Sequence, residues 1–324
     1  MKKILRLLLV FIIVFLLLNQ VFAYFYEKPI RLAIQNKTHE KYLRWSDIHD
    51  TKNKYNTIFL GSSRGFCAYN PEIFDSIANT NSYNMCSGSQ NIIESYYILE
   101  EILKFQKPKI VVYEIFLASF DENADYYHVL SNGSFMTNQV ESDMIIHGFG
   151  IKGVINYLLP VLKHRIYIKD DISYFLLHRT FRGRIDSYQT KWIKGYRPDS
   201  SRVSLKAIRE YPPLESFKSR DVSHKKLTDN FNAFIELCKR SDIKLICVTA
   251  PFPPTRLKRT PVDTVYNYFK AVCEKKSIPY FDLNHLENSK YKYYDTDFLD
   301  EHHMNSFGAD KASKQLAEVI LQSK

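Results

Sequence analysis

Two short stretches, one near the start and one near the end of the chain, carry residues that together could perform nucleophilic catalysis. In TIFLGSSRG, an apolar run stops at a glycine and two serines, the second of which is Ser63. In DEHHMNSFGA, Asp300 and His303 stand three residues apart. A serine hydroxyl becomes a nucleophile when a histidine removes its proton, and that histidine needs an acceptor at its other ring nitrogen. The two stretches therefore hold a complete set of nucleophile, base and acid if the fold brings them together.

Each stretch also has a purely structural interpretation. Serine is common where a strand ends and a helix begins, which would leave Ser63 with the role of a helix cap. The second stretch could be a polar surface loop in which acids and histidines have no chemical role, and His302 competes with His303 as the base. The spacing favours His303, because His302 is only two residues from Asp300 and its ring would point elsewhere.

Short apolar runs alternate with longer helical patterns, and this alternation predicts the elements that would position the two stretches. The predicted strands cover residues 56–61, 82–87, 108–116, 243–251 and 278–284. The predicted helices cover residues 70–78, 89–106, 224–242, 262–277 and 306–322, with Ser306 as the cap of the last. Such an order predicts an α/β fold with a parallel sheet covered on both faces. Ligands bind at the carboxyl ends of the strands in such sheets, which is where Ser63 stands.

The first 26 residues are a basic start followed by an apolar run. This is the form of a secretory signal peptide, and Val21-Phe22-Ala23 would serve as its cleavage site. The alternative is a retained signal anchor, because the run from Ile4 to Tyr26 exceeds the roughly 20 residues that cross a bilayer. The leading lysines would then stay inside. Either interpretation places the rest of the chain outside the cytoplasm, beginning with a stalk over residues 27–54.

An insertion over residues 121–222 divides the predicted α/β domain into residues 55–120 and 223–324. It is basic, rich in aromatic residues and predicted to be mostly helical. Residues 152–209 contain 13 Lys and Arg but 4 Asp, a net +9 in a chain whose formal net charge is +10. This concentration favours an anionic surface nearby, either lipid headgroups or an acidic polymer. Nucleic acid fits poorly with an exported chain that has no recognised binding motif.

The five cysteines show no spacing typical of metal ligands, and we expect no metal or other cofactor. Cys238, Cys247 and Cys273 fall within predicted helices and a predicted strand, where cysteine acts as a small buried hydrophobe. Cys67 and Cys86 both follow predicted strand ends. A disulfide between them is therefore the alternative to burial in an exported protein.

With these residues in view, the chain resembles the SGNH, or GDSL-like, serine esterases and acyltransferases over both parts of the α/β domain. The resemblance rests on the stretches FLGSSRG, NMCSGSQNI, ICVTAPFPP and DEHHMNSFGA. It implies a flavodoxin-like three-layer sandwich in which Ser63 is the nucleophile, completed by Asp300 and His303. It also implies an oxyanion hole formed by the backbone N–H groups of Ser63 and Gly88.

The chain departs from the family's pattern at two places. Ser62 replaces the acid of the first block, and Glu114 and Ser119 stand where the family has an asparagine that donates to the oxyanion. A Gly-Ser-Ser block behind an N-terminal membrane segment resembles the membrane-anchored branch that helps D-alanylate or O-acetylate cell-surface polymers. That resemblance implies an acyl donor, a glycan or polyol acceptor, and a membrane-bound acyl-transfer partner protein.

The sequence thus predicts a serine-dependent ester hydrolase or O-acyltransferase that works through an acyl-serine. It would act at the extracytoplasmic face of the cell membrane, or as a secreted or periplasmic protein if the signal is cleaved. Arg64 would hold a carboxylate or phosphate of the acceptor, or would be a solvated arginine at a helix start. The alternative function is a catalytically silent carbohydrate-binding or scaffold protein on the same fold. Phosphoryl transfer is disfavoured because the chain has no Gly-rich phosphate loop or metal-ligand cluster.

Overall fold

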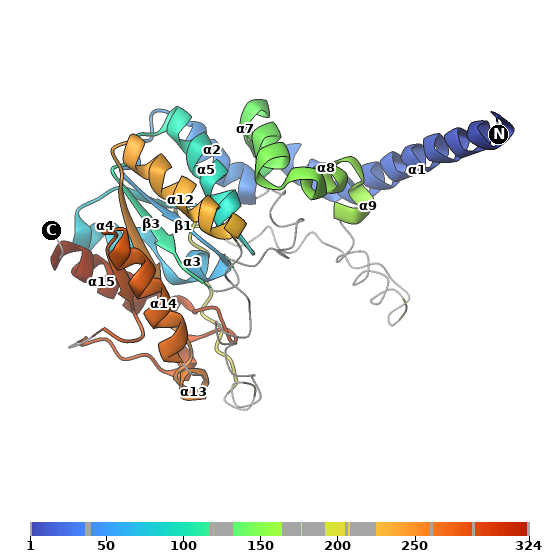
Figure 1. The fold of residues 1–324 in the computed structure, drawn as a ribbon. Coiled ribbons are helices and arrows are strands. Elements are labelled where there is room, and N and C mark those ends of the chain that lie inside the picture. The colour runs from blue at the N-terminus through green and yellow to red at the C-terminus, as the bar shows by residue number, and fades with distance from the viewer. Residues whose placement is uncertain are drawn as a thin grey trace. The chain divides into compact units, whose positions relative to one another are not determined.

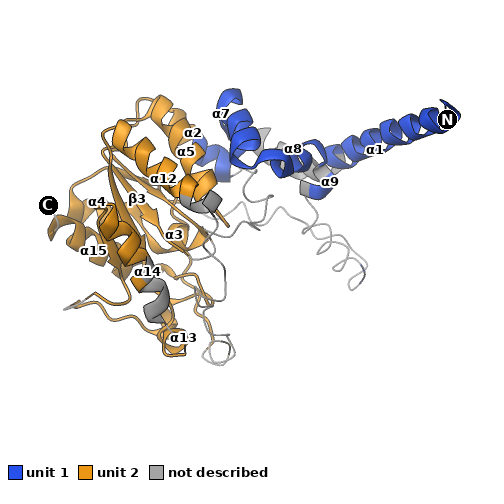
Figure 2. Ribbon diagram, in the orientation of Figure 1, with its two compact units in different colours: residues 1–45, 130–189 blue, residues 46–129, 190–324 orange. Residues whose placement is uncertain are grey.

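A computed structural model provides the structure of the protein. It describes residues 2–35, 40–116, 119, 132–163, 176, 192–204, 207, 225–259, 262–286 and 289–322. The chain divides into two compact units, residues 1–45 with 130–189 and residues 46–129 with 190–324 (Figure 2). We call the second the α/β unit and the first the N-terminal unit, and each is described by itself.

The α/β unit is built on a five-stranded sheet in the order β2-β1-β3-β4-β5 (Figure 1). Every neighbouring pair of strands is parallel. The strands are β1 (Thr57–Leu60), β2 (Ser82–Asn84), β3 (Ile110–Glu114), β4 (Lys244–Thr249) and β5 (Tyr280–Asp282). All four residues of β1 are buried, as expected for a strand covered on both faces. The strand order is that of flavodoxin-like folds, which confirms the predicted fold class.

Helices cover both faces of this sheet. On one face a core cluster joins Phe59 of β1 and Val112 of β3 to Phe74 and Leu316 from the helices. On the other face the ring of Tyr113 lies 5.3 Å from that of Phe234. The first layer contains α3 (Ser63–Ala68), α4 (Pro71–Ala78) and α15 (Ser306–Gln322). The second contains α5 (Ile92–Phe105) and α12 (Lys225–Arg240), while α14 (Val262–Lys275) packs beside β5 and the short α13 (Pro254–Leu257) follows β4.

Helix α15 has the predicted bounds, but its capping residue differs from the prediction by one position. The side-chain oxygen of Asn305 accepts hydrogen bonds from the N–H groups of Phe307 and Gly308, each at 3.1 Å. Asn305 is therefore the cap, because its side-chain Oδ1 atom satisfies backbone N–H donors that lack an intrahelical partner. The hydroxyl of Ser306 instead accepts from the N–H of Asp199 at 3.0 Å.

Asp199 belongs to a segment that the sequence placed in the insertion, residues 192–204. In the structure this segment clusters with the α/β unit. Its Lys194 carbonyl accepts from the N–H of Asn84 at 2.8 Å, at the end of β2. Farther along, the N–H of Arg197 donates to the Phe66 carbonyl in α3 at 3.2 Å. The segment has neither helical nor strand periodicity, so its sequence pattern contained no sign of these contacts.

The described part of the N-terminal unit is helical. Its elements are α1 (Lys2–Gln35), the start of α2 (Glu40–His49), η2 (Gly133–Phe135), α7 (Asn138–Asp143), the π-helical η3 (Met144–Gly148), α8 (Gly150–Leu158) and α9 (Pro160–Lys163). Helix α1 extends nine residues beyond Tyr26, into the predicted stalk. Residues 172–185 of the insertion, which is predicted to be mostly helical, lie outside the described residues, apart from Leu176.

One helix in the described part of the chain is long and apolar enough to cross a membrane, over Lys2–Tyr24. A signal anchor and a signal peptide both have this property, so its length and composition do not separate the two predictions.

All five cysteines are free and buried. The interpretation as small buried hydrophobes therefore describes them, and the alternative Cys67–Cys86 disulfide is not formed. Burial raises the pKa of the Cys67 thiol to about 12, which keeps it protonated and unreactive at neutral pH.

Candidate active site

The turn between β1 and α3 determines where Ser63 lies. Gly61 has a φ of +145°, and a Cβ added there would stand 2.7 Å from the Cβ of Glu114. Only glycine fits this close approach of β1 to β3 without strain. Ser62 then caps α3, its hydroxyl accepting from the N–H of Arg64 at 3.3 Å. Ser63 is the first residue of the helix and stands at the carboxyl edge of the sheet.

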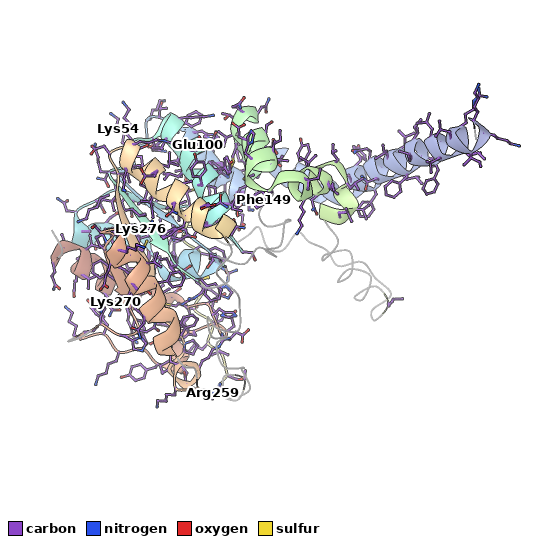
Figure 3. The ribbon with its side chains drawn as sticks, in the orientation of Figure 1. Lys54, Glu100, Phe149, Arg259, Lys270 and Lys276 are labelled. Carbon is purple, nitrogen blue, oxygen red and sulfur yellow. The ribbon has the colours of Figure 1, made fainter. Side chains whose placement is uncertain are left out.

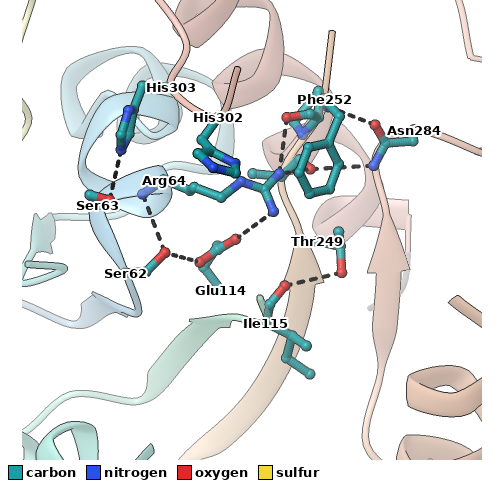
Figure 4. A network of polar contacts seen from close by, with 12 residues as sticks. Ser62, Ser63, Arg64, Glu114, Ile115, Thr249, Phe252, Asn284, His302 and His303 are labelled. Carbon is teal, nitrogen blue, oxygen red and sulfur yellow. Dashed lines mark hydrogen bonds and ion pairs between the residues drawn. The ribbon is translucent and has the colours of Figure 1, made fainter. Parts of the chain in front are cut away.

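The structure brings the hydroxyl of Ser63 to the imidazole of His303. The Nε2 atom of His303 lies 2.7 Å from Ser63 Oγ (Figure 4), and its Nδ1 atom lies 2.8 Å from Asp300 Oδ2. An ionised carboxylate can only accept a hydrogen bond, so Nδ1 carries a hydrogen and donates a hydrogen bond to Asp300 Oδ2. In the neutral ring Nε2 is then an acceptor, and the Ser63 hydroxyl donates to it. This is the arrangement in which a histidine can remove the serine proton.

Asp300 is held as a carboxylate by its own loop. Partial burial would raise its pKa, but the hydrogen bond and charge of His303 and two backbone N–H groups together lower the pKa of Asp300 to about 2. Those N–H groups belong to His302 and His303 and donate to Asp300 Oδ1 at 2.8 and 2.9 Å. The three-residue spacing matters because the same carboxylate binds both the backbone and the ring of His303.

His302 lies apart from this chain of hydrogen bonds. Its Nδ1 atom is 3.0 Å from a guanidinium nitrogen of Arg256, which also donates to the Glu301 carbonyl at 2.8 Å. Burial and the positive charges of Arg256 and Arg64 lower the pKa of His302 to about 3. His302 is therefore neutral at neutral pH, and its Nδ1 atom accepts a hydrogen bond from Arg256.

The buried carboxylate of Glu114 stabilises the turn that carries Ser63. Glu114, the last residue of β3, is fully buried and accepts a hydrogen bond from Ser62 Oγ at 2.9 Å. Its other oxygen lies 3.4 Å from a guanidinium nitrogen of Arg64 (Figure 4). Ser62 stands where the resembled family has an acid, and here a carboxylate reaches that position from β3 instead. Burial raises the pKa of Glu114, and the charge of Arg64 and the hydroxyl of Ser62 oppose this shift.

Neither expectation for Arg64 describes its position. Only 1% of its side chain is exposed, and its guanidinium donates to the carbonyls of Ala250 and Pro251. The same group lies 3.6 Å from the centre of the Phe252 ring. Its donors are thus directed at Glu114 and at carbonyls inside the protein. The predicted contact with an acceptor's carboxylate or phosphate does not fit this burial, and Arg64 is not a solvated arginine either.

The two predicted oxyanion donors lie at the start of α3 and on the loop after β2. The N–H of Ser63 is at the first position of α3, where no intrahelical acceptor exists. Gly88 follows Ser87, whose N–H donates to the Gly61 carbonyl at 3.1 Å. This bond holds the loop after β2 against the turn after β1. The carboxylate of Glu114 cannot serve as a third donor, because it accepts a hydrogen bond from Ser62 and forms an ion pair with Arg64.

Aromatic rings flank the imidazole of His303 on the side of α3. The Phe66 ring lies parallel to it, with centroids 6.5 Å apart, and Trp192 meets Phe66 edge to face at 5.7 Å. The guanidinium carbon of Arg197 is 5.4 Å from the centre of the Phe66 ring. Phe66, Trp192 and Arg197 are all partly exposed. These three side chains form a surface beside the base, which we call the aromatic platform.

Sequence reasoning did not assign roles to Glu114 or Trp192. A charged residue at the end of the otherwise apolar strand IVVYE is a signal that a buried partner must exist. Trp192 gave no such signal, because it stands in a segment without periodicity. Within the described ranges, no group of three or more His, Cys, Asp or Glu residues could hold a metal ion.

No protein-family model matches the chain, and no curated protein matches it. Among solved structures, it is similar to a protein assigned as an acylhydrolase from Bacteroides fragilis NCTC 9343. The two share 13% identity over 82% of this chain and 86% of that one, with a TM-score of 0.38. It is also similar to a protein from Desulfitobacterium hafniense DCB-2 assigned to the G-D-S-L family of lipolytic proteins, at 11% identity over 82% and 98% of the two chains and a TM-score of 0.39. A GDSL-like lipase from Bacteroides thetaiotaomicron VPI-5482 shows 11% identity over 83% and 88%, with a TM-score of 0.36. TM-scores below 0.5 carry no argument about activity, so the function must be argued from the site itself.

Proposed function

We propose that this protein is a serine-dependent ester hydrolase or O-acyltransferase with Ser63 as its nucleophile. One observation supports the proposal above all others: the continuous chain of hydrogen bonds from Ser63 through His303 to Asp300. The chain joins residues 240 positions apart in the sequence, at the carboxyl edge of a parallel sheet. Neither a helix cap nor an incidental surface loop requires such a contact.

The reaction begins when Ser63 Oγ attacks the carbonyl carbon of an ester and His303 Nε2 takes the hydroxyl proton. Asp300 stabilises the imidazolium that results, and it stays ionised while doing so. The backbone N–H groups of Ser63 and Gly88 stabilise the oxyanion. His303 then returns its proton to the leaving alcohol, and the acyl-serine remains. Water or an acceptor hydroxyl, deprotonated by His303, releases the acyl group and restores Ser63.

A fluorophosphonate probe, which reacts with activated serines, tests this proposal. We expect the wild-type protein to be labelled at Ser63 and the Ser63→Ala variant to be unlabelled. Ser76→Ala is the matched control, because Ser76 is a serine on α4 whose hydroxyl binds a carbonyl of its own helix. The His303→Gln variant should be labelled about 10²–10⁴-fold more slowly, the usual contribution of a general base. A wild-type protein that resists the probe would favour the catalytically silent carbohydrate-binding or scaffold alternative.

We propose further that the acceptor is a glycan or polyol at the outer face of the cell membrane. The aromatic platform supports this, since partly exposed rings beside the base offer a face on which a sugar ring can stack. The apolar helix over Lys2–Tyr24 supports a membrane location. In this setting the acyl donor would be supplied by a membrane-bound acyl-transfer partner protein.

Product analysis separates hydrolysis from transfer. A simple acetyl ester is supplied with and without an oligosaccharide acceptor, and acetylated oligosaccharide indicates transfer. For Trp192→Ala we expect a raised KM for the oligosaccharide with little change in acyl-serine formation from the simple ester. The reverse result, a slower acylation with the same acceptor KM, would contradict an acceptor role for the aromatic platform.

A further inference from the structure

Helix α8 in the N-terminal unit exposes an apolar stripe and buries a polar side chain, unlike an ordinary helix in water. Ile151, Ile155 and Leu158 follow at intervals of four and three residues and so lie on one face. Their exposed fractions among the described residues are 73%, 42% and 57%. The buried residues of α8 are Gly153 and Asn156. A water-soluble helix buries its apolar face and exposes its amides, because that arrangement removes apolar surface from water.

Helix α1 shows the same exposure over a longer distance. Its apolar side chains are exposed from Ile4 to Leu18, with Phe11 at 67%. Figure 3 shows side chains projecting outward along the length of this helix. The exception is Asn19, a polar residue that is only 3% exposed although its neighbours are exposed. Polar side chains within a membrane span turn toward protein and find partners there. What covers Asn19 therefore identifies the element that lies beside α1 at this depth.

The partners of Asn19 are the backbone groups at the break between α8 and α9. Its amide nitrogen donates to the Leu158 carbonyl at 3.4 Å, and its amide oxygen accepts from the N–H of Val161 at 3.1 Å. Pro160 interrupts the helix here and leaves such groups without intrahelical partners. Within a bilayer an unpaired backbone group costs several kcal/mol, and proline breaks are tolerated where a neighbouring helix supplies the bonds. Asn19 supplies them.

We infer that α1 is retained as an anchor and that α8 and α9 lie beside it in the outer leaflet of the membrane. Asn19 is near the end of the Lys2–Tyr24 span, so the break at Pro160 lies at the boundary of the hydrocarbon. The exposed stripe of α8 then faces acyl chains, and Tyr157, which is 50% exposed, lies at the depth where interfacial tyrosines gather. A signal peptide that is cleaved off makes no lasting contact with the rest of the protein. Ala23, the residue at the predicted cleavage site, is only 4% exposed, and this burial favours a helix that is retained. The inference is independent of the chemistry at Ser63.

Spin labels in lipid nanodiscs test where the stripe lies. Single cysteines are introduced into the full chain at Ile155, at Phe11 as a lipid-facing reference, and at Lys239, which is 61% exposed on α12, as a water-facing reference. The native thiols are buried, and treating the wild-type protein with the spin label checks that they do not react. The spin label collides with dissolved oxygen and with a water-soluble nickel complex. The ratio of the oxygen rate to the nickel rate rises with the depth of the label in a bilayer. For Ile155→Cys we expect a ratio close to that of Phe11→Cys and severalfold above that of Lys239→Cys.

Two outcomes would overturn the inference. A ratio at Ile155 equal to that at Lys239 would place the stripe in water. Protection from both oxygen and nickel would show that protein covers it, either this chain or a membrane partner. The intact mass of the purified protein provides an independent check, because loss of residues 1–23 would remove the partner of α8. Far-UV circular dichroism of each variant shows that it is folded whether or not Ser63 reacts with the probe, so failure here is distinguishable from failure of the proposed reaction.

A substitution at Asn19 tests the link between the helices. In nanodiscs, Asn19→Leu should lower the Tm, because the Leu158 carbonyl and the Val161 N–H lose their partner where water is scarce. Gln20→Leu is the matched control, since Gln20 is the neighbouring amide and is exposed. Equal effects of the two substitutions would contradict the pairing.

Discussion

At the scale of single residues, Glu114 is the group whose burial demands the most of its surroundings. Taking a carboxylate and a guanidinium out of water costs several kcal/mol each, and only good partners offset this. Glu114 has Ser62 and Arg64, and Arg64 has two carbonyls and a ring as well. The pair joins β3 to the turn that carries Ser63. In the proposed reaction the pair therefore positions Ser63, although neither residue touches the reacting atoms.

Removing one member of this pair should be far more harmful than removing both. For Glu114→Gln we expect the free energy of unfolding to fall by about 3–5 kcal/mol, because Arg64 would remain buried without a counter-charge. Adding Arg64→Met should recover much of the loss. Chemical denaturation measures each step of this double-mutant cycle.

The matched control for Glu114 is the exposed ion pair Lys109–Asp242, in which Lys109 Nζ lies 2.8 Å from Asp242 Oδ2. Asp242→Asn should change the free energy of unfolding very little, since water screens an exposed pair. Strictly additive losses for Glu114→Gln and Arg64→Met would contradict the coupling.

His302 should make the protein sensitive to mild acid. Its pKa is lowered from 6.5 to about 3, so between these values the unfolded chain binds a proton that the folded chain does not. Stability is then fully present above pH 6.5 and falls as the pH drops through this window, by at most about 1.4 kcal/mol per pH unit. His302→Gln should flatten this slope, as measured by thermal unfolding between pH 7 and pH 4. Identical slopes in variant and wild type would show that His302 does not carry the effect.

At the scale of elements, the site depends on how closely β1 approaches β3. Gly61 allows this approach, and the bend after β1 aims the first turn of α3 at the loop of Asp300 and His303. Asn305 holds that loop in turn, since its amide nitrogen donates to the carbonyls of Ser201 and Thr296 while its oxygen caps α15. Ser63 and His303 are thus each held by a turn that is hydrogen-bonded to other segments of the α/β unit.

Substitution of Gly61 should separate backbone strain from steric clash. Gly61→Ala adds a Cβ 2.7 Å from the Cβ of Glu114, and overpacking of this kind typically costs about 1–3 kcal/mol beyond the strain of a positive φ. Gly150→Ala is the matched control, because Gly150 also has a positive φ of +61° but nothing lies within 4 Å of the added Cβ. Denaturation curves should show the larger loss for Gly61→Ala, with slower probe labelling. Equal losses would mean that β3 moves aside without cost.

At the scale of the whole molecule, the positive charge and the exposed apolar surface suit two different binding partners. The apolar surface of α1 and α8 suits lipid, whereas the excess of positive charge lies in residues 152–209. A segment with 13 basic and 4 acidic residues attracts an anionic polymer over a distance of about 10 Å at 0.1 M salt.

Binding to an acidic polysaccharide should therefore depend on salt. With the protein in nanodiscs of neutral lipid, we expect affinity to fall as ionic strength rises from about 0.1 M to about 1 M, where the screening length shrinks to about 3 Å. A neutral polysaccharide of similar length serves as control and should bind with little salt dependence. Salt-independent binding of the acidic polymer would argue that the basic segment has no part in recognition.

Local patterns in the sequence were sufficient to predict an α/β fold with a covered parallel sheet and the apolar N-terminal helix, whereas the flavodoxin-like arrangement was implied by the family resemblance. Local patterns suffice for the first two because burial imposes a periodicity on each strand and helix, and that periodicity is written in neighbouring residues. The same holds for Asp300 and His303, whose spacing on one tight loop is a local property. Ser63 could be named as a candidate because it ends a predicted strand.

Only the tertiary structure decided what depends on residues far apart in the chain. The contact of Ser63 with His303, the burial of Arg64 against Glu114 and the packing of residues 192–204 on the α/β unit all join segments that have no common local pattern. Arg64 was expected at the surface because arginine is rarely buried, and the structure overrides this tendency with a partner 50 residues away. Whether a charge is solvated or paired is decided by what the fold places beside it, and no window of neighbouring residues contains that information.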